Sequence, residues 1–214
     1  MVKTQKWLIG VDEAGRGPLA GPVAVGVVVV SKDFNWSCIE GVGDSKKVSP
    51  KNREMVFKRA LQLQKEGKLD FKVVLVSAKT IDAIGIVPSI IQAIDRALLA
   101  IEKAYLVTSP RTVLGEVGIV KLDGGLKAPE RYIQQETIIK GDSKEKVIGL
   151  ASILAKVTRD RYMVQKSTES IFAPYGFDIH KGYGTKVHRE LIQKNGLSIE
   201  HRKSFCKRFI PSEG

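Results

Sequence analysis

Cysteine and histidine are scarce in this chain, with two and three copies among 214 residues. Cys38 and Cys206 form none of the paired spacings that bind zinc, and they do not make a disulfide framework. No run approaches the roughly 18 apolar residues that a membrane-spanning helix requires, and the N-terminal residues lack the cleavage-like site of a signal peptide. These absences predict a protein of a reducing compartment, the cytoplasm, without a membrane partner.

Acidic residues are also in deficit. The chain carries 23 Asp and Glu against 35 Lys and Arg, which gives a formal net charge of +12. A surplus of this size favours polyanionic partners, because each phosphate that a protein neutralises releases a condensed counterion. The charge therefore indicates nucleic acid as the partner, although a generally basic surface is the alternative.

What the chain does have is enough apolar sequence, 43% of all residues, for one ordinary core. Apolar, β-branched runs come first, and later runs alternate with segments of helical spacing, a pattern that predicts one mixed α/β sheet with flanking helices. We expect the main domain to span 1–195, with a basic, helical tail at 196–214. The expected strands are 7–11, 23–30, 71–77, 118–123 and 137–140, and the expected helices are 51–65, 88–106, 144–164 and 186–194.

Carboxylates directly follow three of the expected strands. Asp12 and Glu13 come after W-L-I-G-V, Asp123 after G-I-V-K-L, and Asp142 after T-I-I-K-G. Sites in α/β sheets form beyond the carboxyl ends of the strands, so these acids are expected to converge there. Four oxygen ligands suit one or two Mg²⁺ or Mn²⁺ ions. The alternative for each acid is a turn or cap, and D-S-K-E from Asp142 resembles a capping box.

The stretch D-E-A-G-R-G-P-L-A-G, which begins at Asp12, joins the first two expected strands. Its glycines have the spacing G-x-G-x-x-x-G and a strand follows, whereas a dinucleotide fingerprint reads G-x-G-x-x-G and opens a helix. Glycines on both sides of Arg16 instead predict a loop whose backbone amides approach an anion closely. A simple glycine-rich hairpin turn is the alternative.

Together with this stretch, several longer motifs resemble bacterial ribonuclease HII, the type-2 ribonuclease H. They occur in family order between residues 10 and 205 and include G-D-S-K-K-V-S, L-D-G, K-G-D-S, A-S-I-L-A-K-V-T-R-D-R, Y-G-F-D-I-H-K-G-Y-G-T and H-R-K-S-F. The resemblance implies an RNase H-like fold with a mixed five-stranded sheet and a helical C-terminal part. Two departures are Gly43, where the family often has Asn, and Gly85, within S-A-K-T-I-D-A-I-G-I.

The resemblance also implies a function and its residues. We expect a monomeric endonuclease that cleaves the RNA strand of RNA/DNA hybrids and the 5′ side of single ribonucleotides in duplex DNA, as in ribonucleotide excision repair. It is expected to leave a 3′-OH and a 5′-phosphate, and to use Mg²⁺ or Mn²⁺, with two ions during catalysis. The implied metal-binding and catalytic acids are Asp12, Glu13, Asp123 and Asp142, and the implied substrate-binding residues are Gly15, Arg16, Gly17, Ser45, Lys46 and Tyr183.

Further basic residues near these motifs are expected to hold the duplex: Lys47, Lys156, Arg159, Arg161 and Lys181. A second hypothesis is a non-catalytic nucleic-acid-binding module on the same fold, but such a module would be expected to have lost one or more of the four strand-end acids. A nucleotide-binding oxidoreductase is disfavoured by the glycine spacing and by the strand after the loop.

Overall fold

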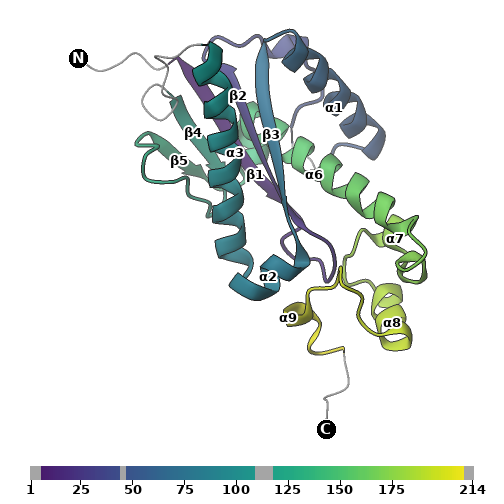
Figure 1. Ribbon diagram of the computed structural model, residues 1–214. Helices are drawn as coiled ribbons and strands as arrows, with labels where there is room; N and C mark the ends of the chain where they lie inside the picture. The colour runs from purple at the N-terminus through teal and green to yellow at the C-terminus, as the bar shows by residue number, and fades with distance from the viewer. Residues whose placement is uncertain (1–5, 44–46, 109–117, 210–214) are drawn as a thin grey trace.

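A five-stranded mixed sheet forms the centre of the computed structural model, which describes residues 6–43, 47–108 and 118–209. The strands lie in the order β3-β2-β1-β4-β5, and Figure 1 shows helices on both sides of them. This confirms the predicted fold class. The strands are β1 (Trp7–Ala14), β2 (Val23–Ser31), β3 (Leu69–Val76), β4 (Gly118–Asp123) and β5 (Gln135–Ile138).

The direction of the strands decides where the acids lie. β1 runs antiparallel to β2, whereas β1, β4 and β5 are mutually parallel, with Val11 beside Leu122. Parallel neighbours bring their carboxyl ends to the same edge of the sheet. Asp12 in β1 and Asp123 at the end of β4 therefore share one edge. The last strand ends two residues before its predicted end, at Ile138.

Each face of the sheet is covered by its own helices. α2 (Ala78–Ile84) and α3 (Ile86–Thr108) contribute to a core with one face, and α1 (Pro50–Lys65) and α6 (Lys146–Ser167) to a core with the other. α6 lies very close to β1, because a Cβ added at Gly10 would stand 2.3 Å from the carbonyl oxygen of Val147. Only glycine admits such an approach, which brings the next turns of α6 over the end of β1.

The helix starts differ in how well the sequence predicted them. Ser49 caps α1 by accepting a hydrogen bond from the amide of Asn52, and Pro50 follows it at the first helical position, where proline is favoured. The capping-box interpretation of D-S-K-E is wrong. Asp142 lies inside a separate short helix, α5 (Gly141–Lys144), and the carboxylate of Glu145 accepts a hydrogen bond from Nζ of Lys121 at 2.6 Å. α2 was not predicted as a helix; it ends at Ile84, and Gly85 caps its C-terminus.

The C-terminal segments gather beyond the turn between β1 and β2, at the lower end of the sheet in Figure 1. Ala20 in that turn forms a backbone bridge with His201. Within the tail, Lys203–Cys206 forms the short helix α9. The remaining elements are α7 (Phe177–His180), α8 (Lys186–Asn195), α9 (Lys203–Cys206) and two short 3-10 helices, Trp36–Cys38 and Ala173–Tyr175.

Within the described residues, no single helix has both the length and the apolar character needed to cross a membrane. The bent pair Ala78–Ile84 and Ile86–Ala104, with an angle of 117° between its parts, reaches that length and composition only when the two are taken together. Its apolar side chains supply much of the core on one face of the sheet.

Candidate active site

The four strand-end acids line one cleft at the carboxyl edge of the sheet. Asp12 and Glu13 come from β1, Asp123 from β4 and Asp142 from α5. The glycine loop after β1 and a tyrosine from a segment far along the chain reach the same cleft. The other lining residues are Ala14, Gly15, Arg16, Gly17, Arg53, Ser152, Lys156 and Tyr183.

Asp12 is the most deeply placed of these acids. Its side chain accepts a hydrogen bond from the amide of Glu13 at 2.7 Å and another from the hydroxyl of Ser152, on α6. Burial nevertheless raises the pKa of Asp12 well above its usual value, and the nearby carboxylates of Glu13 and Asp123 raise it further. The site therefore concentrates negative charge in a place that disfavours it.

The other acids are held by different contacts. Burial raises the pKa of Glu13, while the guanidinium of Arg16, 3.3 Å from its carboxylate, acts in the opposite direction. Asp123 accepts a hydrogen bond from the amide of Gly141 at 2.6 Å, which ties β4 to the start of α5. That contact brings Asp142, the next residue along α5 and itself buried, to the same cleft.

The donor set fits a hard divalent cation. All four side chains offer carboxylate oxygens, and a cation among them would relieve the repulsion and the burial cost that raise the pKa of Asp12. As they stand, no three His, Cys, Asp or Glu side chains of the described residues are gathered at ligand spacing. Mg²⁺ is usually bound by one or two carboxylates and keeps positions for water and phosphate oxygens, so a cleft lined by carboxylates suits it.

The two glycines that flank Arg16 differ from each other. Gly15 has a φ of 87°, and an added Cβ would stand 2.0 Å from Nε of Arg159. Gly17 has no positive φ, and nothing lies within 4 Å of the Cβ position. Of the two, only Gly15 therefore uses the left-handed backbone conformation that glycine allows. Gly17 is exposed and also lines the cleft.

Tyr183 stands at the mouth of the cleft with 41% of its surface exposed. Nζ of Lys156 lies 5.4 Å and the guanidinium carbon of Arg159 lies 5.5 Å from the centre of its ring. Its backbone carbonyl accepts from the amide of Thr185 at 2.8 Å and stands 2.9 Å from Nδ1 of His188. The ring is thus exposed while its backbone is fixed, as a surface for stacking requires.

Some of the expected substrate contacts do not lie at the cleft, and two residues that line it were not expected. Ser45 and Lys46 lie outside the described residues. Arg159 is wrong as a duplex contact, because its side chain is completely buried and donates to backbone carbonyls. Arg53 and Ser152 also line the cleft, although no pattern in the sequence indicates a role there for either residue. Helical spacing alone does not show which positions of α1 and α6 face the end of a distant strand.

Comparison with known proteins agrees with this geometry. A family model described as Ribonuclease HII matches residues 9–209. The chain is 43% identical over 203 residues to Ribonuclease HII of Clostridioides difficile (strain 630), covering 94% of this chain and 70% of that protein. It is also 43% identical over 205 residues to Ribonuclease HII of Caldicellulosiruptor saccharolyticus, covering 96% of this chain and 89% of that one.

Solved structures show the same fold. Ribonuclease H2 from Pyrococcus horikoshii OT3 superposes with a TM-score of 0.67 at 24% identity, covering 95% of this chain and 98% of that one. Bst-RNase HIII in complex with Mn²⁺ gives 0.69 at 16% identity, covering 96% and 70%. The family match spans both the acids and the glycine loop, so the chain belongs to the ribonuclease HII family and is a ribonuclease H that cleaves the RNA strand of RNA/DNA hybrids.

Proposed function

We propose that this ribonuclease H depends on Mg²⁺ or Mn²⁺ and also cleaves duplex DNA on the 5′ side of a single embedded ribonucleotide, leaving a 3′-OH and a 5′-phosphate. One observation carries the proposal. Four carboxylates, the loop from Gly15 to Gly17 and the ring of Tyr183 line a single cleft. The cleft thus joins a place for hard cations to groups that are able to contact a nucleic-acid sugar and backbone.

Asp12, Glu13, Asp123 and Asp142 would hold the ions. When bound, such ions activate a water molecule and stabilise the oxygen that leaves from phosphorus. The chain's own residues fix the ligands for this task, since Ser152 and the amide of Glu13 orient Asp12. The amide of Gly141 orients Asp123 at 2.6 Å.

The loop and the tyrosine would select the sugar. The 2′-OH distinguishes RNA from DNA because it both donates and accepts hydrogen bonds, and small backbone groups are able to reach it. Gly17 leaves the space for that approach, and Arg16, which is half exposed beside Glu13, lies close to where the phosphate would be. Tyr183 offers its exposed ring to the sugar or base at the ribonucleotide–deoxyribonucleotide junction. Such a substrate fits a part in ribonucleotide excision repair.

The test is cleavage of an end-labelled duplex that carries one ribonucleotide, in Mg²⁺, in Mn²⁺ and in chelator. The all-DNA duplex of the same sequence and a continuous RNA/DNA hybrid serve as controls. We expect cuts at the ribonucleotide only with a divalent cation, and products with a 3′-OH and a 5′-phosphate. Cleavage in chelator would refute the metal dependence. An intact single-ribonucleotide duplex, with the hybrid cut, would refute the proposed substrate.

A further inference from the structure

Two arginines lie buried behind the glycine loop. The side chain of Arg202, just before α9, is fully buried and donates three hydrogen bonds to backbone carbonyls of one short segment. Nη2 donates to Gly15 at 2.7 Å, Nη1 to Arg16 at 3.0 Å and Nε to Gly21 at 3.0 Å. One guanidinium therefore forms hydrogen bonds with both ends of the segment from Gly15 to Gly21.

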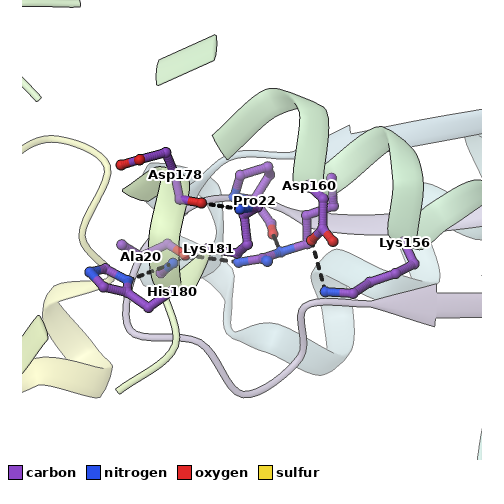
Figure 2. A network of polar contacts seen from close by, with 9 residues as sticks. Ala20, Pro22, Lys156, Asp160, Asp178, His180 and Lys181 are labelled. Carbon is purple, nitrogen blue, oxygen red and sulfur yellow. Dashed lines mark hydrogen bonds and ion pairs between the residues drawn. The ribbon is translucent and has the colours of Figure 1, made fainter. Parts of the chain in front are cut away.

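Arg159 of α6 completes the arrangement from the other side. It is also fully buried, and it donates from Nε to the carbonyl of Pro22 at 2.9 Å and from Nη2 to that of Ala20 at 3.0 Å. Dashed lines at Ala20 and Pro22, both labelled in Figure 2, mark these hydrogen bonds. Between them, the two guanidiniums bind five carbonyls of residues 15–22.

Burial of two guanidinium groups costs folding free energy, which indicates that the arrangement serves a function. Among the described residues, neither guanidinium forms an ion pair with a carboxylate, and Nη1 of Arg159 has no hydrogen-bond partner. A buried cation without a counter-charge disfavours the folded state unless dipoles compensate it. Here the compensating dipoles are backbone carbonyls. They all come from the loop that borders the cleft.

The planar geometry of the peptide bond determines the direction in which the amides of the loop point. In a planar trans peptide the C=O and the following N–H point in opposite directions, and the chain has no cis peptide bond in its described residues. Because the carbonyls of Gly15 and Arg16 point to Arg202, the amides of Arg16 and Gly17 point away from it. Neither amide has an acceptor among the described residues. Two adjacent free amides next to a left-handed residue form a concave site for an anion or hydroxyl oxygen.

We propose that Arg202 and Arg159 are positioning residues for ribonucleotide selection. Arg202 holds the carbonyls of Gly15 and Arg16 inward so that the amides of Arg16 and Gly17 face the cleft and read the 2′-OH or the adjacent phosphate. Arg159 holds the carbonyls of Ala20 and Pro22 and so fixes the other end of the same loop. This inference rests on the proposed function and deepens it. The two buried positive charges also make the site more attractive to an oxygen that carries negative charge.

The test measures binding, in chelator, so that it does not depend on cleavage. Two fluorescent duplexes of one sequence are compared, one with a single ribonucleotide and one of DNA throughout. Arg202→Lys keeps a positive charge but loses the planar fork that reaches three carbonyls. We expect the wild-type protein to prefer the ribonucleotide duplex, and the variant to lose about threefold to tenfold of that preference, the range for one hydrogen bond. Affinity for the all-DNA duplex should change little.

Arg59→Lys is the matched control. Arg59 lies on α1 and also donates to a backbone carbonyl, that of Cys38 at 2.8 Å, but it does not touch the loop. Its replacement should leave the preference unchanged. If Arg202→Lys does not fold, Arg159→Lys carries the same test, since it removes the fork at Ala20 and Pro22. Circular dichroism and a melting curve show which variant is folded, and the binding test uses that variant.

The outcomes separate the two proposals. An unchanged preference in the folded arginine variant overturns the positioning role, and so does an equal loss of affinity for both duplexes. Equal binding of the two duplexes by the wild-type protein overturns it as well. The proposed function fails on a different result, namely an intact ribonucleotide duplex after incubation of the wild-type protein with Mg²⁺ or Mn²⁺.

Discussion

A Cβ placed on Gly15 would stand 2.0 Å from Nε of Arg159, a buried side chain that lies 144 positions further along the chain. Gly17, two residues away, has nothing within 4 Å of the same position. The two glycines of the loop therefore serve different purposes. Gly15 is required by the fold, whereas Gly17 has open space at its Cβ position and lines the cleft.

Substitution of the two glycines should separate stability from activity. Gly15→Ala forces a side chain into a φ of 87° and against Arg159, so we expect a loss of more than about 1 kcal/mol of unfolding free energy. Gly17→Val should unfold at nearly the wild-type temperature and yet fail to cut at a single ribonucleotide. Thermal unfolding and cleavage assays on both variants check this. Cleavage at the parental rate by Gly17→Val would mean that the loop is only a hairpin turn.

Removal of a carboxylate charge from the cleft should abolish catalysis. Asp12→Asn and Asp123→Asn keep the side-chain shape but lose a charged ligand. Because changes around a metal ligand alone cost about 10–100-fold, we expect roughly a hundredfold loss or more. Asp142→Asn should be milder in Mn²⁺ than in Mg²⁺. Single-turnover cleavage rates in both cations provide the measurement, and a loss below about tenfold at Asp12 would argue against the site.

Tyr183 should matter more for one substrate than for the other. Its ring is 41% exposed at the mouth of the cleft while its backbone is held by Thr185 and His188. Tyr183→Ala removes the ring without disturbing those contacts, so we expect cleavage at a single ribonucleotide to fall by tenfold or so, as for loss of one stacking contact. Cleavage of a continuous RNA/DNA hybrid should fall less. Equal losses on the two substrates would contradict a role in recognising the junction.

All three histidines of the chain lie together, and they should make stability depend on pH. Nδ1 of His201 accepts from the amide of Ser198, so its Nε2–H donates to Nε2 of His188 at 3.1 Å, and Nδ1–H of His188 donates to the carbonyl of Tyr183. The ring of His180 stacks 4.1 Å from that of His188. This chain of bonds requires His188 and His201 to be neutral.

Burial, together with the neighbouring histidine rings, lowers the pKa of both His188 and His201 to about 4. Between that value and the ordinary one near 6.5, the unfolded chain binds protons that the folded chain does not. Their contribution to stability is thus complete above about pH 6.5 and is lost as the pH falls toward 4, by roughly 3 kcal/mol for each histidine. Denaturant unfolding from pH 8 to 4.5 measures this slope. The variant His201→Gln should show a shallower slope, and an identical one would refute the assignment.

Duplex binding should weaken with salt, because phosphate contacts release counterions. We expect at least a tenfold loss of affinity between about 50 and about 200 mM salt. Arg53, which lines the cleft, should contribute, so Arg53→Ala should reduce the slope of log K against log salt by about one. Lys103→Ala on the exposed side of α3 is the charge-matched control and should leave it unchanged. A flat salt dependence would mean that the net charge of +12 is not used on nucleic acid.

Local patterns in the sequence were enough to predict where the acids lie and which loop residue needs glycine. Asp12 and Asp123 follow apolar runs, and the parallel pairing of β1 with β4 makes any two such acids neighbours at one edge. Gly15 could likewise be predicted to need freedom that other residues lack. These inferences succeed because the side-chain period of a strand and the conformational range of glycine are properties of a few adjacent residues.

Tertiary structure alone decided how the basic residues are used. Arg159 and Lys156 lie on the same helix and look equivalent in the sequence, yet Arg159 is fully buried under the loop while Lys156 lines the cleft. Arg202 reaches Gly15 across 187 positions of sequence. Whether a guanidinium contacts phosphate or a backbone carbonyl depends on which distant segment of the chain packs against it. A local sequence pattern does not predict that packing.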